Sequence, residues 1–506
     1  MPGMKQTAAR VYEWFERRLQ LEGPVKDAVL HQVPRSTASW FYVFGSAAFT
    51  LLFLQIITGI LLALVYVPSA GEAWTSLNVL NHQIPLGWFL RAMHGWGSNF
   101  MVAIVLIHMA QVFLFGAYKF PRELTWILGV FLLLMTLGMA FTGQVLRFDQ
   151  DAYWGLGIGA SIMSRVPFIG GGLVHLLLGG PIIAGATLSR FFTLHVFVIP
   201  GTMLLFVCLH VWMVLKLGIN EWPMPGRLVN RATYVEEYNH LAHTDGIPFV
   251  PGAFWKDLIF SGAVLAAVAV CALVLGPFGP GGQPDPSIIQ TVPKPDFFFL
   301  WIYTVLSYLP PAMETPFILI VPIVAIAILL AVPFFAAEGE KSWHRRPVAV
   351  LLVSLVAVCW GVLTQLGTTT PWSPHMSAWS GDALPVHLLV NSTPLVRQGA
   401  AVFQAKQCRN CHSVGGSGGE RGPALDNVAT RLTIDQMRFK VVTGGGNMPA
   451  YGKNLSPAEI EALVSFLETL HPANEPPAYD ASRRAVETSQ AEPPSTTSPA
   501  RQSSNP

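Results

Sequence analysis

The sequence has 506 residues, of which 52% are hydrophobic and only 12% are charged. A soluble protein carries about 25% charged residues, so this chain cannot cover itself with polar surface and must be solvated largely by lipid. The net charge of +2 excludes the strongly basic surface of a nucleic-acid-binding protein, and five cysteines exclude a disulfide-rich secreted scaffold.

The N-terminal segment, residues 1–35, mixes basic side chains with apolar ones such as Trp14 and Phe15. It lacks an apolar stretch followed by a small-residue cleavage site, so it is not expected to be a signal peptide. The pattern predicts an amphipathic helix on the membrane surface.

Seven uncharged apolar stretches are long enough to cross about 30 Å of hydrocarbon as helices. They lie at about 40–66, 92–118, 124–146, 191–215, 258–278, 315–337 and 347–367. Three further apolar stretches, 152–164, 166–189 and 297–309, are too short or too rich in glycine and proline, and we expect them to be interfacial or re-entrant. The sequence therefore predicts an all-α, polytopic membrane bundle of four plus three helices.

Positive charge alternates between the loops. The N-terminal segment and the loops at 119–122, 216–256 and 338–346 are basic. The loops at 67–91, 147–190 and 277–314 carry few positive charges for their length. Because basic loops stay in the cytoplasm, the N-terminus is predicted inside and, after seven spans, the C-terminus outside.

Four histidines lie within the predicted spans: His94 and His108 in the second, His195 and His210 in the fourth. A single histidine there would more often hydrogen-bond a neighbouring helix, but the set is different. Spacings of 14 (94 to 108) and 15 (195 to 210) return each pair to roughly one helix face, about 21 Å apart along the helix. This predicts two stacked bis-imidazole sites for haem iron. Zinc is less favoured because no third or fourth ligand lies near.

Glycines repeat at the same spacing in two other spans. Gly45 and Gly59 are 14 residues apart, and so are Gly129 and Gly143. Glycine also serves ordinary helix packing in membranes. A porphyrin wedged between helices needs positions without side chains, and the match to the histidine spacing favours two non-covalent haems b.

The sequence becomes polar from about 393 and contains the C-x-x-C-H attachment signature of haem c at Cys408, Cys411 and His412. A chance or zinc-binding match is the alternative. The cysteines would bind the haem covalently and His412 would be its proximal ligand, with Met448 on a glycine-rich loop as the other. We predict a small α-helical cytochrome c domain at 393–472 and a disordered tail at 473–506. Haem c is attached outside the bacterial cytoplasmic membrane, in agreement with the predicted topology.

Spans one to four resemble cytochrome b of the quinol-oxidising cytochrome bc complexes, bc1 and b6f. The matching stretches are Pro121-Arg-Glu-Leu-Thr-Trp126, Phe148-Asp-Gln150 with Tyr153-Trp154, and Arg190-Phe-Phe-Thr-Leu-His195. The 15-residue spacing and the three-span second half resemble the b6f type, in which the two halves are separate chains. The resemblance implies a four-helix haem-b domain at 36–220, a three-helix subunit-IV-like domain at 221–372 and a fused class I cytochrome c.

The resemblance also implies ligand roles. His94 with His195 would bind the outer, low-potential haem b, and His108 with His210 the inner one. Arg91, at the start of the second span, is a further candidate cofactor-binding residue.

Two quinone sites are implied in the same way. The family's outer quinol site has a Pro-Glu-Trp-Tyr motif, and this chain reads Pro295-Asp296-Phe297-Phe298. The acid is kept as Asp296, a candidate proton acceptor, while the tyrosine hydroxyl is lost. Lys256 and Asp257 match a pair near the family's inner quinone site, although a solvated helix start would look similar.

The implied function is that of a quinol:cytochrome c oxidoreductase subunit, which passes electrons through two haems b and one haem c and translocates protons by a Q-cycle. A Rieske iron–sulfur protein would be a separate chain, because no cluster-ligand pattern is present here. The resemblance also implies a homodimer and a soluble or membrane-bound cytochrome c or oxidase as acceptor. The alternatives are a haem b anchor or electron conduit for another respiratory enzyme, and a haem–copper oxidase subunit, which would need more spans and a copper-binding histidine cluster.

Overall fold

The computed structural model describes residues 10, 12–14, 16–18, 23, 31–180, 183, 185–285, 293–369, 383–406, 408–419, 422–444, 448, 451–452 and 455–478. The chain divides into two compact units. The membrane unit comprises residues 1–284 and 293–370, and the C-terminal unit comprises residues 285–292 and 371–506. Most of the predicted surface segment 1–35 and most of the predicted disordered tail lie outside the described residues.

Seven helices in the described part of the chain are long and apolar enough to cross a membrane, which confirms the predicted number of spans. They are α3 (Phe44–Ala63), α5 (Gly87–Leu114), α6 (Glu123–Leu146), the continuous run Ala186–Leu217, α13 (Phe254–Leu275), α15 (Pro311–Phe335) and α16 (Pro347–Thr369). The fourth of these consists of α9 (Gly185–Thr193), the π turn η2 (Leu194–Val198) and α10 (Ile199–Leu217).

The three stretches that were predicted not to cross form shorter helices, α7 (Gln150–Ser164), α8 (Gly170–Leu178) and α14 (Leu300–Tyr308). The prediction for 166–189 was wrong at its end, because the fourth span begins at Ala186. At 1.5 Å per residue these helices are about 22, 14 and 14 Å long, too short for the hydrocarbon layer. The chain is therefore an all-α, multi-pass membrane protein.

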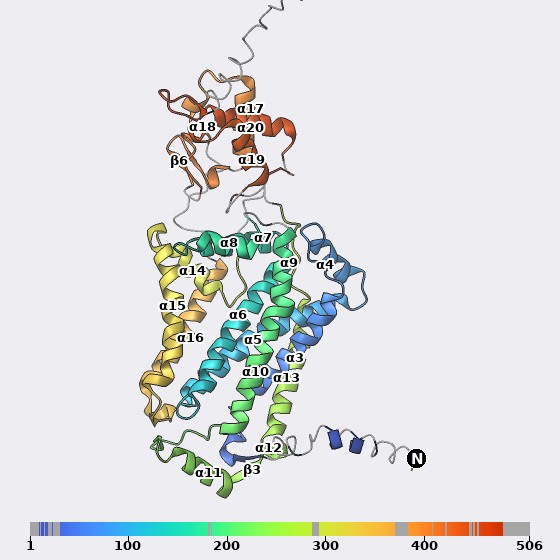
Figure 1. The fold of residues 1–506 in the computed structure, drawn as a ribbon, viewed down its shortest axis with the longest axis vertical. Coiled ribbons are helices and arrows are strands. Elements are labelled where there is room, and N and C mark those ends of the chain that lie inside the picture. Colours follow the sequence, from blue (N-terminus) through green and yellow to red (C-terminus); the bar gives the residue numbers. More distant parts are fainter. Residues whose placement is uncertain are drawn as a thin grey trace, which may run out of the picture. The chain divides into compact units, whose positions relative to one another are not determined.

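Helices α3, α5, α6 and α10 form a bundle, and α13 packs against α3 and α5. Their facing side chains make an apolar core that includes Leu51, Met101, Met203 and Val268. Helix α15 packs on α6, and α14 packs on α16. The last three spans thus extend the bundle built by the first four (Figure 1).

Short elements cover the two ends of the membrane unit (Figure 1). One end, called the α7 end below, carries α4 (Ala73–His82), α7 and α8. The opposite end, called the α11 end, carries α11 (Tyr234–Thr244), α12 (Phe249–Gly252), the antiparallel strands β1 (Gln32–Pro34) and β3 (Gly246–Pro248), the antiparallel strands β2 (Leu228–Val229) and β4 (Gly339–Glu340), and the 3₁₀ turns η1 (Arg35–Thr37) and η3 (Trp343–Arg345).

A buried charged cluster at the α11 end joins the segment after the fourth span to the segment before the seventh. The Glu221 carboxylate lies 3.0 Å from Lys341 Nζ and 3.1 Å from Arg227 Nε. The Tyr234 hydroxyl donates to the same carboxylate at 2.7 Å. Because each buried charge has a partner, the cluster holds the two parts of the membrane unit together without an uncompensated ion.

The C-terminal unit is a small helical domain with its own apolar core. Its elements are η5 (Val386–Leu389), α17 (Pro394–Ala405), η6 (Cys408–Asn410), β5 (Ser413–Val414), β6 (Ser417–Gly418), α18 (Val428–Arg431), α19 (Ile434–Thr443) and α20 (Pro457–Glu468). Thr433 and Ser456 begin α19 and α20 with complete capping boxes. Helices α17 and α20 pack closely, with the Phe403 and Phe466 ring centroids 5.4 Å apart.

Candidate haem and quinone sites

The structure brings His94 of α5 and His195 of η2 together near the α7 end. Their ring centroids are 6.2 Å apart and the rings are inclined by 76°. Two metal–imidazole bonds of about 2 Å each, plus the distance from each bonded nitrogen to its ring centre, span about 6 Å. The separation therefore fits one metal ion held between the two rings.

A threonine hydroxyl contacts each of these rings. Thr58 Oγ1 lies 2.8 Å from His94 Nδ1, and Thr142 Oγ1 lies 2.9 Å from His195 Nδ1. Sequence reasoning missed both threonines. The available signal was their position directly before Gly59 and Gly143, within the glycine repeat.

His195 lies in the π turn η2, just before Pro200. Proline has no N–H to donate to a helical carbonyl. A π turn, which contains one extra residue, accommodates the missing hydrogen bond. This explains why the histidines of this span are 15 residues apart (195 to 210) whereas those of α5 are 14 apart (94 to 108). In a regular helix a spacing of 15 residues would leave the two side chains about 60° apart around the axis, and the extra residue of the π turn reduces that offset.

The second pair, His108 of α5 and His210 of α10, lies about 21 Å further along the helices. The two rings are close enough to interact electrostatically. No described side chain hydrogen-bonds Nδ1 of either ring. The structure thus contains two histidine pairs at two depths, with different surroundings.

The four predicted glycines lie beside the four histidines. A Cβ added at each would approach a histidine Cε1: Gly59 to 3.2 Å from His94, Gly143 to 2.9 Å from His195, Gly45 to 3.3 Å from His108, and Gly129 to 3.7 Å from His210. Absent side chains at both levels leave room beside the rings for a flat macrocycle. The residues present therefore fit two haems b.

Arg91 is 8% exposed and lies one helical turn before His94. Its Nε donates to Asn81 Oδ1 at 2.8 Å, while its buried Nη2 has no partner among the described residues. A buried guanidinium nitrogen without an acceptor is costly. It fits an anionic group at this level, such as a haem propionate.

Asp296 lies outside the spans, between residue 293 and α14. Burial raises the pKa of the Asp296 carboxyl; nearby Arg147 opposes the shift and Asp149 adds to it. The Asp149 side chain is held in place as the N-cap of α7, because it accepts a hydrogen bond from the Ala152 amide at 2.9 Å. The predicted proton acceptor thus sits beside the charged corner between α6 and α7.

The rest of the predicted quinol-site motif faces apolar partners. Phe298 is 3% exposed and packs in a cluster with Val102 and Ala140. The Phe297 ring lies 6.0 Å from the Trp360 ring and 5.2 Å from Phe298, centroid to centroid. Pro295 precedes them as irregular backbone.

Lys256 and Asp257 lie near the α11 end, at the start of α13. Lys256 Nζ donates to the Ala38 carbonyl at 2.6 Å and lies over the Trp255 ring at 5.3 Å. Asp257 is 8% exposed and hydrogen-bonded to Ser46. The two side chains therefore contact different partners, and only Lys256 lies at an aromatic surface.

In the C-terminal unit, η6 places Cys408, Cys411 and His412 on one turn, with the His412 amide 3.0 Å from the Cys408 carbonyl. His412 Nδ1 lies 2.8 Å from the Pro423 carbonyl, an acceptor, so Nδ1 carries the proton and Nε2 is left for a metal. Gly422 lies directly against the His412 ring. These residues fit a covalently bound haem c. Met448 is partly buried, but the residues on both sides of it lie outside the described chain.

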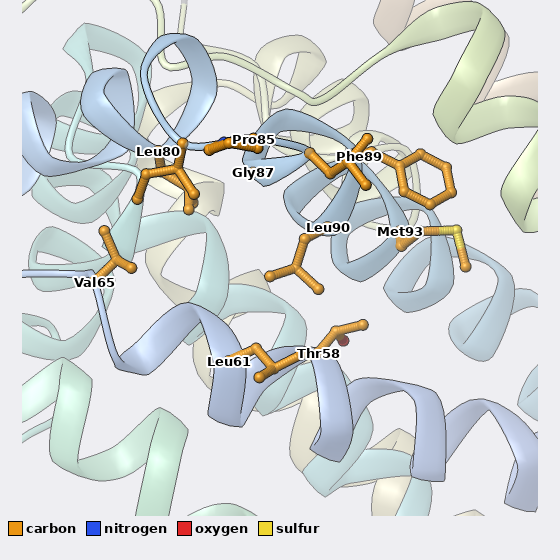
Figure 2. Close-up of a pocket in the computed structure, with 11 residues that line it drawn as sticks. Thr58, Leu61, Val65, Leu80, Pro85, Gly87, Phe89, Leu90 and Met93 are labelled. Atoms are coloured by element: carbon orange, nitrogen blue, oxygen red, sulfur yellow. The ribbon is translucent and has the colours of Figure 1, made fainter.

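A cavity of about 500 Å³ lies between α3, α4 and the start of α5 near the α7 end, as Figure 2 shows. Thr58 is the one polar side chain among its eleven lining residues, which also include Leu61, Leu90 and Met93. None of the predicted quinone-site residues lines it.

Three family models match successive parts of the chain. The model for cytochrome b/b6/petB matches residues 29–218, and that for cytochrome b(C-terminal)/b6/petD matches residues 285–383. The model for cytochrome C oxidase, cbb3-type, subunit III matches residues 394–467.

Curated relatives are cytochromes b6. The protein of Synechococcus elongatus is 36% identical over 212 residues, which are 42% of this chain and 98% of the relative. Those of Auxenochlorella protothecoides and Chlamydomonas reinhardtii are 37% and 36% identical over 212 residues, with the same coverage. The chain belongs to the cytochrome b/b6 family.

This cytochrome b/b6-family chain also resembles a solved structure named hyperthermophilic respiratory Complex III. The TM-score is 0.62 at 26% identity, covering 71% of this chain and 91% of that one. The expected resemblance, the b6-like and petD-like halves and the added cytochrome c domain are thereby confirmed. The membership implies haem b in the membrane unit, and the match to the cbb3-type subunit III model implies haem c in the C-terminal unit.

Proposed function

We propose that this chain is the cytochrome b and cytochrome c subunit of a bc-type quinol:cytochrome c oxidoreductase. The observation that carries the proposal is the pair of histidine sites at two depths of one bundle, each flanked by glycines, with a partly buried acid, Asp296, beyond the outer pair. A bundle with only a structural role would not need imidazoles at either level.

The proposed domains follow the predicted boundaries. Residues 36–220 would hold two haems b, residues 221–372 would complete the quinone sites, and residues 393–472 would hold haem c. When bound, the haems would supply one-electron redox chemistry, the haems b on a path across the membrane and haem c on a path toward the acceptor. His94 with His195, and His108 with His210, would hold the two haems b; His412 with Met448 would hold haem c, and Arg91 would pair with a propionate.

The α7 end would be the outer face. There the Asp296 carboxylate would accept a proton from the quinol hydroxyl, and burial with a raised pKa makes it a better base than an ordinary aspartate. Phe297 and Phe298 would present an apolar wall to the quinol ring and exclude water. Protons would leave on this side.

The α11 end would be the inner face. Lys256, held against aromatic rings at the start of α13, would donate to a quinone oxygen, and the buried Asp257 carboxyl would supply a proton to the reduced ring. Proton release outside and uptake inside would store energy across the membrane, as a Q-cycle requires.

The resemblance to bc-type complexes indicates partner subunits. The described residues contain no cluster of three or more metal-binding side chains, so an iron–sulfur cluster would be carried by a separate Rieske protein. We propose a homodimeric complex in a bacterial cytoplasmic membrane, with the N-terminus inside and haem c outside, passing electrons to a cytochrome c or an oxidase.

Haem stoichiometry tests the proposal. Redox difference spectra and pyridine haemochrome analysis of the purified protein should give two b-type haems and one c-type haem per chain. Any other ratio would contradict it.

Replacement of Asp296 by Asn separates a quinol-oxidising enzyme from an electron conduit. D296N should lower quinol oxidation by two or more orders of magnitude, the usual contribution of a general base, with haem content unchanged. Glu72→Gln is the control, since Glu72 is an exposed acid at the same end whose side chain caps no helix. Unchanged turnover in D296N would favour the anchor or conduit.

A further inference from the structure

The two histidine pairs differ in one respect that neither their spacing nor their glycines reveals. At the α7 end, threonines contact both rings: Thr58 reaches His94 Nδ1 at 2.8 Å and Thr142 reaches His195 Nδ1 at 2.9 Å. At the other level no described side chain hydrogen-bonds either Nδ1. Each level also has one backbone group that interacts with a histidine, that of Met139 with His195 and that of Thr125 with His210. Among the described residues, the two levels therefore differ in side-chain hydrogen bonds to the rings through the threonine hydroxyls.

The geometry assigns the direction of these hydrogen bonds. The Thr58 hydroxyl lies 2.6 Å from the Leu54 carbonyl, and the Thr142 hydroxyl lies 2.9 Å from the Gly138 carbonyl. A carbonyl can only accept, so each hydroxyl proton goes to the backbone and the hydroxyl oxygen accepts from histidine. Nδ1 therefore carries the ring proton, and Nε2 is the nitrogen left for iron.

The sequence shows why the other pair differs. Thr58 and Thr142 directly precede Gly59 and Gly143. Fourteen residues earlier, the positions before Gly45 and Gly129 hold Phe44 and Leu128, which have no side-chain acceptor.

The surroundings of Thr58 strengthen its hydrogen bond. Thr58 is 6% exposed, and the cavity beside it is otherwise lined by apolar side chains (Figure 2). Thr142 is 5% exposed. In a medium of low dielectric constant a hydrogen bond is electrostatically stronger than in water.

On the proposed function, in which these rings ligate a haem, we propose that Thr58 and Thr142 are positioning residues that lower the reduction potential of the haem at the α7 end relative to the other. A ligating histidine that donates its second N–H becomes a more basic ligand. More basic ligands stabilise ferric over ferrous iron, and hydrogen bonding around the ligands is one means by which a protein sets a haem potential. Electrons entering at the α7 end would then move energetically downhill to the second haem.

Redox potentiometry on the purified complex, followed by the α-band absorbance of the b-type haems, tests whether the threonines lower the potential. In the double variant Thr58→Val, Thr142→Val, the lower-potential b component should shift upward. We expect the ratio of reduced to oxidised haem in this component to change about tenfold at a fixed potential. This corresponds to an upward shift of its reduction potential by about 59 mV for one electron. The higher-potential component should not move. A His94→Leu variant, which should lack the outer haem, identifies which component belongs to that level.

Matched variants separate tuning from packing. Thr58→Ser with Thr142→Ser keeps both hydroxyls and should keep both potentials. Thr136→Val removes a buried hydroxyl from the same helix as Thr142. This hydroxyl donates to the Leu132 carbonyl at 2.8 Å and hydrogen-bonds no histidine of the described chain, so its loss should shift neither component. If the double valine variant loses haem, the two single valine variants provide the same measurement with one threonine intact.

The outcomes are distinct. Unshifted potentials in valine variants that retain two b-type haems would overturn this inference and leave the proposed function standing. A wild-type protein without two b-type components would overturn the proposed function as well.

Discussion

The Glu221 carboxylate and the Lys341 ammonium group lie 3.0 Å apart, with side chains 3% and 2% exposed, although 120 positions (341 − 221) separate them along the chain. Burial alone would raise the pKa of Glu221, but Lys341, the Tyr234 hydroxyl and Arg122 outweigh it and lower the pKa to about 2. The ion pair is thus a tertiary contact that stabilises the membrane unit.

Glu221→Gln should therefore destabilise the protein strongly. It leaves the buried Lys341 and the partly exposed Arg227 without their counter-charge, and the loss of a buried pair costs about 3–5 kcal/mol. Unfolding in denaturant, followed by release of b-type haem, measures it. Glu338→Gln, which breaks an exposed bridge to Arg231, should cost at most about 1 kcal/mol. Equal effects of the two variants would contradict the prediction.

The stability of the wild-type protein should depend on pH through the same carboxylate. A lowered carboxyl pKa contributes stability above the ordinary value of 4.5, and that stability is lost as the pH falls toward about 2. Unfolding measured between pH 6 and pH 3 should show this loss, and E221Q should show less of it. A slope identical in both proteins would exclude Glu221 as its source.

Quinol oxidation should depend on pH through Asp296. Burial raises the pKa of this carboxyl above 3.8, and only its unprotonated form can take a proton. The rate should therefore fall as the pH drops through the raised pKa. Steady-state rates across pH should show this acidic limb in the wild-type protein and in D296E, and D296N should lack it. A limb that persists in D296N belongs to another group.

Gly143→Val should abolish the haem at the α7 end. Even a Cβ at this position would lie 2.9 Å from His195 Cε1, and valine adds two methyl groups. The pyridine haemochrome should show one b-type haem per chain instead of two, with haem c unchanged. Gly262→Val is the control, because nothing lies within 4 Å of a Cβ at Gly262. Retention of both haems b in G143V would argue against a macrocycle beside this glycine.

Cys408→Ser with Cys411→Ser should remove covalently bound haem. Haem staining of the denatured chain should disappear, while the two non-covalent haems b remain in the native spectrum. Cys359→Ser, at an exposed cysteine of α16, should leave the staining intact. Staining that survives the double substitution would exclude this attachment site.

Local features of the sequence were sufficient for the architecture. Hydrophobic length identified the seven spans, and short length or a high content of glycine and proline excluded the segments that became α7, α8 and α14. The 14-residue repeats identified two levels within the bundle, because a helix returns to nearly the same face after that interval. The C-x-x-C-H motif was sufficient to predict a haem c site, because the attachment chemistry needs only one turn of chain.

Tertiary packing decided what surrounds those residues. Thr58 reaches His94 across 36 positions, and Thr142 reaches His195 across 53. Asp296 lies near Arg147 and Asp149, although two membrane spans separate it from them along the chain. The π turn at η2 accounts for the one-residue difference between the histidine spacings of 14 and 15, which the sequence alone did not explain. Side chains distant along the chain become neighbours only when helix faces pack, and their hydrogen bonds and charges then depend on that packing rather than on any local pattern.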